Sequence, residues 1–192
     1  MRFIGLILAR KGSKRVPGKN TLLLNNKALV CHTIEAALGC KFFNDIIVGS
    51  DDPLILRLAE EYESSKIIAY ERIEVDDLET SGDSAIKILE HMDTEDEDII
   101  VLLQPTSPFR TSKRIGEMIV RFMQDPDLDC LYTLDKDTMN PAGSVYVLQY
   151  KTLYNTKAFY GRYSKGRLVG GKEAMDIDNL DDWRKVQAYE RE

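Results

Sequence analysis

Apolar segments of strand length alternate with segments of helical periodicity along this 192-residue chain. The first apolar run, 3–9, is continuous, as expected of a central strand covered on both faces. The other predicted strands are 46–48, 66–70, 99–103, 129–134 and 144–149, and the predicted helices are 29–38, one that opens at 51–53, 83–92, 111–123 and 179–189. This alternation predicts an α/β fold with a doubly wound, mainly parallel sheet.

Composition and charge exclude several classes of protein. Hydrophobic residues make up 43% of the chain and charged residues 30%, which is typical of a folded globular protein. The net charge of −6 argues against a nucleic-acid partner, which needs a broad basic surface. We expect no membrane association, because no apolar run has spanning length and the N-terminal run lacks a signal-peptide cleavage site. Three cysteines without paired spacing predict reduced thiols in the cytoplasm. The acidic stretch 93–98 is predicted to be a solvated loop.

The loop after the first strand concentrates positive charge on an acidic chain. Five of the ten residues from Arg10 to Lys19 are lysine or arginine. Ligands of such sheets bind beyond the carboxyl ends of the strands, and lysine, arginine and flexible glycines suit phosphate groups. The loop is therefore a candidate polyanion site, with a solvated basic loop as the alternative. The glycine spacing disfavours a P-loop, since five residues separate Gly12 from Gly18, and no dinucleotide fingerprint is present.

Residues 8–20 read Leu-Ala-Arg-Lys-Gly-Ser-Lys-Arg-Val-Pro-Gly-Lys-Asn. This segment resembles the signature of the acylneuraminate cytidylyltransferase family, Ala-Arg-x-Gly-Ser-Lys-Arg-x-Pro-x-Lys-Asn, at every fixed position. The resemblance implies a single domain over 1–192 with a three-layer fold like that of nucleotide-diphospho-sugar transferases. It also implies that the loop wraps the triphosphate of CTP. The candidate catalytic residues are then Arg10, Lys19 and Asp178. The candidate nucleotide-binding residues are Ala9, Arg10, Gly12, Ser13, Lys14, Lys19, Asn20, Arg72, Ser81 and Gln104.

Two further segments resemble nucleotide-binding parts of the same family. Residues 102–110, Leu-Leu-Gln-Pro-Thr-Ser-Pro-Phe-Arg, resemble its Leu-Gln-Pro-Thr-Ser-Pro-Leu-Arg motif. The amide of Gln104 can both donate and accept hydrogen bonds and could read the polar edge of cytosine, although a proline-rich turn is the alternative. Arg72 matches an arginine of the family, but the residues after it depart from the pattern, and Glu79 stands where an aspartate is expected.

A pair of acidic residues near the end of the chain is a candidate metal site. Asp176 and Asp178 resemble the second and fourth residues of the family's Ile-Asp-Ile-Asp motif. Carboxylates at i and i+2 on a strand point to the same face, and Mg²⁺ is usually held by one or two carboxylates together with substrate phosphates. The resemblance implies that these two residues hold Mg²⁺. The alternative is that they cap the final helix.

The acceptor end departs most from the family. Residues 141–147 resemble its Pro-Asn-Gly-Ala-Ile-Tyr-Ile motif, but Ala142 replaces the asparagine. The segment 111–140 is shorter than in the family and lacks a stretch that contributes to the acceptor pocket and the dimer. The resemblance implies transfer of a cytidylyl group from CTP to sialic acid or a related nonulosonic acid, and a possible homodimer. Two alternatives stay open: the same chemistry on another acidic sugar such as Kdo, and a nucleotide-binding relative with impaired catalysis.

Overall fold

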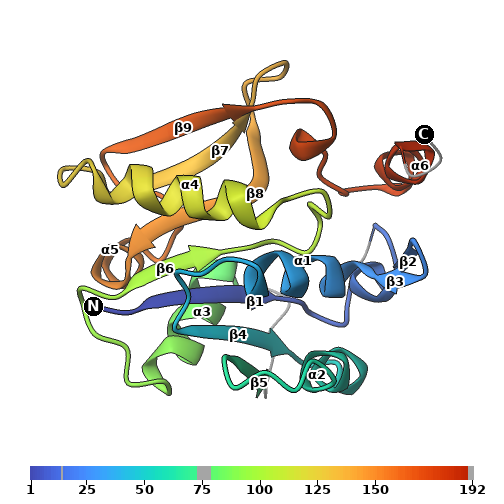
Figure 1. Cartoon of the computed structure of the whole chain (residues 1–192), viewed down its shortest axis with the longest axis horizontal. Helices are drawn as coiled ribbons and strands as arrows, with labels where there is room; N and C mark the ends of the chain where they lie inside the picture. The colour runs from blue at the N-terminus through green and yellow to red at the C-terminus, as the bar shows by residue number, and fades with distance from the viewer. Residues whose placement is uncertain (14, 73–78, 190–192) are drawn as a thin grey trace.

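The chain folds around one seven-stranded sheet with the strand order β5-β4-β1-β6-β8-β7-β9 (Figure 1). The computed structural model describes residues 1–13, 15–72 and 79–189. Its strands are β1 (Phe3–Leu8), β2 (Leu23–Leu24), β3 (Lys27–Ala28), β4 (Asp45–Ser50), β5 (Ile67–Glu71), β6 (Ile99–Leu102), β7 (Cys130–Asp135), β8 (Pro141–Gln149) and β9 (Ser164–Val169). Its α-helices are α1 (Leu29–Leu38), α2 (Pro53–Glu60), α3 (Ser81–Glu90), α4 (Ser112–Met123), α5 (Tyr150–Thr156) and α6 (Leu180–Tyr189), and its 3₁₀ helices are η1 (Lys19–Thr21) and η2 (Gly171–Ala174).

The direction of the strands confirms the mainly parallel sheet. Strand β1 pairs in parallel with β4 and β6, and β4 pairs in parallel with β5. Strand β8 runs antiparallel to both β6 and β7, while β7 and β9 are parallel to each other. The first residues of β8 therefore lie at the same edge of the sheet as the carboxyl ends of its neighbours.

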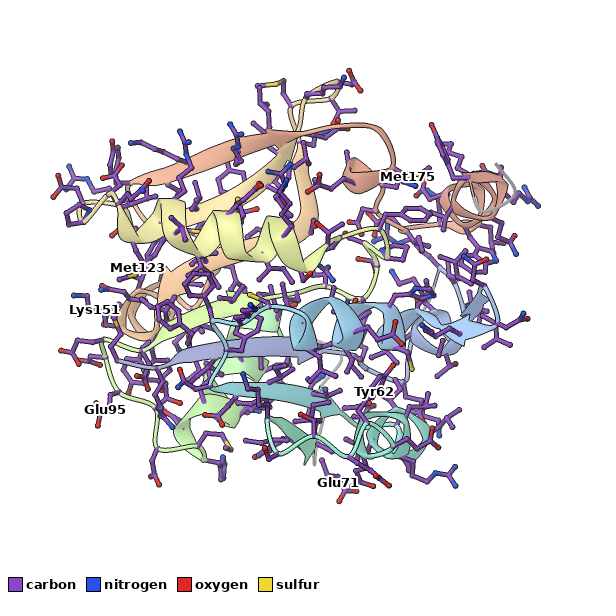
Figure 2. All side chains as sticks on the ribbon, in the orientation of Figure 1. Tyr62, Glu71, Glu95, Met123, Lys151 and Met175 are labelled. Carbon is purple, nitrogen blue, oxygen red and sulfur yellow. The ribbon has the colours of Figure 1, made fainter. Side chains whose placement is uncertain are left out.

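Helices cover both faces of the sheet, as a doubly wound fold requires. One apolar cluster joins α1, α2 and α4 to alternate strand residues such as Ile7, Val48 and Val101. A second cluster joins α3 and α5 to the intervening residues, among them Leu6 and Ile100. Tyr62 packs against the first cluster (Figure 2). Its hydroxyl donates to the Glu35 carboxylate of α1 over 3.1 Å.

Polar residues at the helix starts explain why the helices begin where they do. Asp52 accepts a hydrogen bond from the Leu54 amide, with Pro53 in the first turn of α2. Thr80 and Asp83 form a reciprocal capping box, so α3 begins at Ser81, two residues before the predicted start at Asp83. Thr111 caps α4, and Asn179 accepts from the amides of Asp181 and Asp182 at the start of α6. The helices predicted to open at 51–53, at 111 and at 179 therefore begin at or next to those positions.

Several elements were not predicted from the sequence, among them a hairpin, a strand and a helix. The short hairpin of β2 and β3 turns at Asn25 and Asn26, whose φ angles of 52° and 58° are those of a two-residue hairpin turn. Strand β9 is a mostly exposed edge strand, and its sequence Ser-Lys-Gly-Arg-Leu-Val has little apolar character. Helix α5 is only seven residues long. All three lack the long apolar periodicity on which the prediction depended.

Among the described residues, no helix combines the length and apolar character needed to cross a bilayer.

The prediction of a solvated loop at 93–98 is wrong for its last residue. The Asp98 side chain is buried. It accepts hydrogen bonds from the Arg2 amide (2.6 Å), the Arg2 guanidinium (2.8 Å) and the Glu95 amide (3.1 Å). Burial alone would raise the pKa of Asp98, but these hydrogen bonds outweigh it and lower the pKa. Asp98 therefore fastens the start of β1 to the start of β6.

Replacing Asp98 with alanine is expected to lower the free energy of unfolding by about 2 kcal/mol, because the Arg2 amide and the partly exposed Arg2 guanidinium lose the carboxylate that accepts their hydrogen bonds. Since its folded-state pKa is depressed, the contribution of Asp98 is present above the unfolded pKa and is lost as the pH falls through the folded pKa. Urea denaturation at pH 7 and at decreasing pH measures both effects. Asp96→Ala, at an exposed position of the same loop, is the control. Equal effects of the two substitutions would contradict the role of Asp98.

Candidate active site

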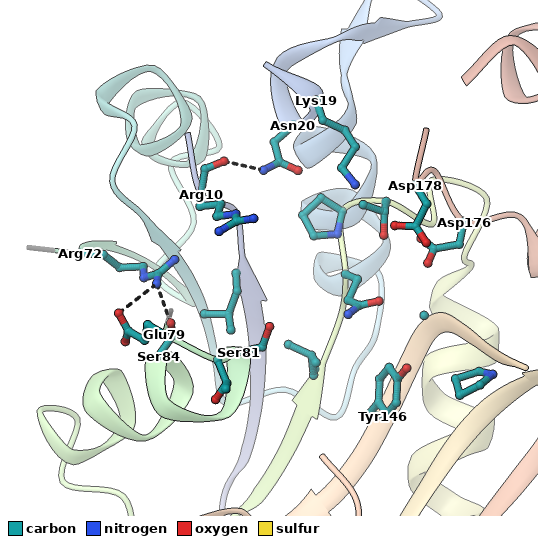
Figure 3. A pocket seen from close by; sticks show the side chains of 18 residues that line it. Arg10, Lys19, Asn20, Arg72, Glu79, Ser81, Ser84, Tyr146, Asp176 and Asp178 are labelled. Carbon is teal, nitrogen blue, oxygen red and sulfur yellow. Dashed lines mark hydrogen bonds and ion pairs between the residues drawn. The ribbon is translucent and has the colours of Figure 1, made fainter. Parts of the chain in front are cut away.

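A pocket of about 630 Å³ opens at the edge of the sheet where the parallel strands end (Figure 3). Strand β1 leads into this pocket at Arg10 and β6 leads into it at Gln104, while β8 starts beside them at Pro141. The start of α3 borders one side and the segment 176–178 borders the other. The lining residues are Leu8, Arg10, Lys19, Asn20, Arg72, Glu79, Thr80, Ser81, Ser84, Leu102, Gln104, Pro105, Thr106, Pro141, Gly143, Tyr146, Asp176 and Asp178.

The basic loop folds back on the end of β1. Asn20 is buried, and its amide donates to the backbone carbonyl oxygen of Arg10 over 2.9 Å. Gly18 has a φ of 63° and precedes η1, so a residue without a Cβ suits this turn. Asn20 thereby brings the two ends of the loop together, and Arg10 and Lys19 both line the pocket.

Lys19 reaches across the pocket mouth to the acidic segment. Its Nζ donates to the backbone carbonyl oxygen of Ile177 over 2.6 Å. Burial lowers the pKa of Lys19, while the carboxylates of Asp176 and Asp178 oppose that shift. The ammonium group therefore lies beside both acids without pairing directly with one of them.

Asp176 and Asp178 point into the same pocket (Figure 3). The expected strand is not formed there: the segment lies between η2 and α6, outside the sheet. Its conformation is held by Ile177, which is fully buried and whose amide donates to the Thr106 carbonyl oxygen over 3.0 Å. Main-chain hydrogen bonds of Ile177 to Thr106 and Lys19 thus replace the ladder of a strand and still leave both carboxylates on one side.

The acid pair carries negative charge that the described residues only partly compensate. Burial raises the pKa of Asp176, the charge of Asp178 raises it further, and hydrogen bonds from Thr106 and Ser107 and the charge of Lys19 act in the opposite direction. Asp178 has an exposed ion pair with Arg15 at 3.7 Å. Within the described part of the chain, no group of three or more acidic, histidine or cysteine side chains could hold a metal. A divalent cation here would need further oxygen ligands from a substrate.

The opposite side of the pocket is built around Arg72. Its guanidinium donates to the Ser84 hydroxyl over 2.6 Å and lies 3.9 Å from the Glu79 carboxylate. The side chains of Arg72 and Glu79 are only 9% and 7% exposed. Figure 3 shows Arg72, Glu79 and Ser84 on one side of Arg10 and the acid pair on the other. The pocket therefore has two chemically different ends.

Gln104 lies beside the acid pair. A Cβ added to Gly143 would come within 2.5 Å of the Gln104 Oε1 and 2.9 Å of the Asp176 Oδ2, so both side chains pack against this glycine. The backbone of Gln104 is held by Arg110, whose guanidinium donates to its carbonyl oxygen over 2.5 Å. Arg110 also donates to the Ser144 carbonyl oxygen and the Thr33 hydroxyl. This buried arginine joins α1, β8 and the loop after β6.

The comparison with known families agrees with this geometry. A family model described as Cytidylyltransferase matches residues 4–157. The chain belongs to the cytidylyltransferase family. Among curated relatives, the CMP-N,N'-diacetyllegionaminic acid synthase of Legionella pneumophila is 31% identical, over 95% of this chain and 94% of that protein. The N-acylneuraminate cytidylyltransferase of Escherichia coli O18:K1:H7 is 29% identical over 95% of this chain, which spans only 50% of that longer protein.

Solved structures confirm the predicted fold of this cytidylyltransferase. The structure of CMP:2-keto-3-deoxy-manno-octonic acid synthetase, described as complexed with CTP, superposes with a TM-score of 0.76. The alignment covers 98% of each chain at 17% identity. At this identity the likeness concerns the fold, which is that of the nucleotide-diphospho-sugar transferases expected from the sequence.

The structure places most of the predicted site residues of this cytidylyltransferase around one pocket: Arg10, Lys19, Asn20, Arg72, Ser81, Gln104, Asp176 and Asp178. Ala9, Gly12 and Ser13 do not line it. Ala9 is buried behind the pocket, where its amide donates to the Gly49 carbonyl oxygen and its own carbonyl oxygen accepts from Ser50. Lys14 lies outside the described residues.

Several residues at this site of the cytidylyltransferase were not predicted from the sequence, and Ser84, Tyr146 and Arg110 show why. Ser84 follows Ser81 by one helical turn, and this spacing was a usable signal. Tyr146 lines the pocket because it pairs with Leu102 across the antiparallel β6 and β8. Arg110 belongs to the motif that contains Gln104, but its burial depends on the packing of distant segments, which the sequence pattern does not reveal.

Gly143→Ala is expected to lower turnover by about tenfold to 100-fold, because the added Cβ would displace the Gln104 amide and the Asp176 carboxylate. Gly143 also has a φ of 67°, so alanine adds backbone strain. Gly171→Ala is the matched control: its φ is 60°, but nothing lies within 4 Å of an added Cβ. Steady-state kinetics and thermal melting of both variants separate displacement from strain. Equal losses of turnover would show that strain alone is responsible.

Proposed function

We propose that this chain transfers a cytidylyl group from CTP to an acidic 2-keto sugar and releases pyrophosphate. The observation that carries the proposal is the arrangement of Arg10 and Lys19 beside the paired carboxylates of Asp176 and Asp178 around one pocket. Cations suit the phosphates of a nucleotide, and paired hard oxygen ligands suit a divalent cation that shares those phosphates.

The acid pair fits Mg²⁺ on the chemistry of its donors. Desolvation raises the pKa of Asp176, and no described residue forms an ion pair with it. A cation held by Asp176, Asp178 and substrate oxygens would neutralise the part of their charge that Lys19 and Arg15 leave uncompensated. When bound, Mg²⁺ would neutralise phosphate charge and lower the pKa of a coordinated hydroxyl.

The protein's own residues would act mainly by positioning and by charge. In the reaction, the anomeric hydroxyl oxygen forms a bond to the α-phosphorus and its proton is released to solvent. The bond from that phosphorus to the bridging oxygen breaks, and pyrophosphate leaves in line. We propose that Arg10 and Lys19 stabilise the charge that develops on the phosphate oxygens, and that Asn20 keeps the loop in place. None of the described side chains stands out as a dedicated general base.

The two ends of the pocket suggest how CTP is oriented. The phosphates would lie against Arg10, Lys19 and the acid pair, so the nucleoside would extend toward Arg72 and Ser81 at the start of α3. The motif around Gln104 predicted that this residue reads the edge of cytosine. Because Gln104 lies beside Asp176, we now propose that its amide acts near the reacting phosphate and the acceptor sugar.

The class of acceptor follows from the relatives. Their names include N-acylneuraminate, N,N'-diacetyllegionaminic acid and 8-amino-3,8-dideoxy-manno-octulosonate, all acidic sugars. The segment 111–140 contains only α4, β7 and their connections, consistent with the proposed shortening of the acceptor and dimerisation region. We propose a cytoplasmic location, because the three cysteines are free and buried. The homodimer stays a prediction, which a measurement of the mass in solution would test.

Pyrophosphate release tests the proposed function. The chain is incubated with CTP, ATP, GTP or UTP, with Mg²⁺, and with each of a panel that contains sialic, legionaminic, pseudaminic and Kdo sugars. We expect release only with CTP and at least one acidic sugar. Binding of CTP without turnover across the panel would instead favour a nucleotide-binding relative with impaired catalysis. Absence of CTP binding would overturn both.

A further inference from the structure

The buried carboxylate of Glu79 has no role in the reaction proposed above. It lines the pocket beside Arg72, and its side chain is 7% exposed. One oxygen lies 3.9 Å from the Arg72 guanidinium and the other lies 3.4 Å from the Lys87 ammonium. A carboxylate can accept about four hydrogen bonds, so these two cations leave it capacity to accept from a ligand.

Glu79 and Arg72 lie at the end of the pocket where the proposed orientation places the base. The acid pair and Lys19 occupy the phosphate end, and Arg10 lies between the two ends (Figure 3). The Ser84 hydroxyl accepts from Arg72 and so fixes the guanidinium next to the carboxylate. A ligand at this end therefore meets a fixed donor group beside a fixed acceptor group.

This arrangement of a donor and an acceptor complements the hydrogen-bonding edge of cytosine but not that of uracil. Cytosine presents a 4-amino donor next to its N3 and O2 acceptors, whereas uracil presents an O4 acceptor next to an N3–H donor. With cytosine, the amino group meets Glu79 and the acceptors meet Arg72. With uracil in the same position, O4 meets the carboxylate and N3–H meets the guanidinium, so both contacts are unfavourable.

We propose that Glu79 determines the base specificity of this site by accepting a hydrogen bond from the 4-amino group of cytosine, with Arg72 reading the adjacent acceptor edge. The inference rests on the proposed function, which supplies the orientation of the nucleotide. It assigns to Glu79 the rejection of UTP, and it assigns to Lys87 and Arg72 the task of holding the carboxylate toward the base.

Nucleotide binding without any sugar tests this assignment on the full chain. Calorimetric titration with CTP and with UTP, both with MgCl₂, gives the preference of the wild-type protein and of Glu79→Gln. In the variant an amide donor replaces one of the two carboxylate oxygens, so the 4-amino group of cytosine loses an acceptor and O4 of uracil gains a donor. We expect the preference for CTP over UTP to fall by about tenfold or more. Glu71→Gln, at an exposed position at the end of β5, is the matched control and should keep the wild-type preference.

A third nucleotide makes the test independent of the variant's folding. The triphosphate of pyrimidin-2-one riboside lacks the 4-amino group, and wild-type protein should bind it about tenfold more weakly than CTP. Equal binding of these two nucleotides by the wild type would overturn the proposal. An equal loss of CTP and UTP binding in Glu79→Gln would place the carboxylate at the ribose and would also overturn it. If wild-type protein prefers CTP but Glu79→Gln does too, only this inference fails; if wild-type protein binds no nucleotide, the proposed function fails with it.

Discussion

Lys19→Met is expected to lower turnover by about 100-fold or more while the protein stays folded. The ammonium group lies at the mouth of the pocket beside two carboxylates, where burial lowers its pKa but the acids oppose the shift. Loss of one charge that stabilises developing negative charge in a preorganised site typically costs a few kcal/mol of transition-state stabilisation. The kinetic constants for CTP, with the acceptor sugar saturating, measure the effect.

The control for Lys19 is Lys11→Met in the same loop. Lys11 does not line the pocket, and its backbone amide, which the substitution leaves in place, donates to Asp51. The two variants lose the same charge from the same loop, so a general electrostatic attraction of CTP would affect both alike. Similar losses in the two variants would contradict the specific role of Lys19, as would wild-type kinetics in Lys19→Met.

Asp176→Asn is expected to lower Mg²⁺-dependent turnover by about 100-fold and, at the same time, to raise the melting temperature. Burial and the neighbouring Asp178 raise the pKa of Asp176 above its ordinary value, so the ionised carboxylate lowers the stability of the folded protein at neutral pH. Asparagine removes that charge in a side chain of similar shape. Such gains in stability at a site that is poised for a ligand commonly accompany a loss of function.

The sign of the pH effect follows from the raised pKa. As the pH falls through the folded pKa, the wild-type carboxylate becomes protonated and its destabilising effect disappears. The difference in melting temperature between wild type and Asp176→Asn should therefore shrink toward acid pH. At neutral pH, Mg²⁺ with CTP should stabilise the wild type more than the variant, because ligand binding stabilises by mass action.

Asp181→Asn provides the comparison for Asp176. Asp181 is an exposed carboxylate that pairs with Arg184 on α6 and does not line the pocket. Its loss should change neither the metal titration nor turnover. An unchanged Mg²⁺ titration in Asp176→Asn would remove that residue from the metal site, and a lower melting temperature would show that its charge is better compensated than the structure indicates.

Local sequence signals predicted the scaffold and the two charged parts of the site. Continuous apolar runs predicted β1 and β6, and the polar residues that follow them, Arg10 and Gln104, lie in the pocket. The spacing of Asp176 and Asp178 predicted two carboxylates on one side, although main-chain contacts of Ile177, not a sheet ladder, produce it. These features depend on neighbours in the chain.

Contacts between distant segments escaped prediction. Asp98 appeared to belong to a solvated acidic run, but Arg2, 96 residues away in sequence, holds it in the interior. The burial of Arg110 is tolerated because the carbonyl oxygens of Ser144 and Gln104 accept hydrogen bonds from its guanidinium. A single sequence shows that such residues are charged, but not which partners make their burial tolerable. The same reason hid the pairing of Glu79 with Arg72 and Lys87.

The reversed direction of β8 has a consequence for how such a scaffold can change its substrate. Because β7 and β8 are antiparallel, the turn 136–140 joins them directly, and the Asp135 amide donates to the Asn140 carbonyl oxygen at its base. Asp137, Thr138 and Asn140 of this turn line a neighbouring cavity together with Asp176 and Asp178. Insertions at this turn would add new surface next to the acid pair. They would leave the pairing of the seven strands of the sheet unchanged. Changes to this one short connection would therefore alter the proposed acceptor site and leave the strands that position Arg10 and Gln104 unchanged.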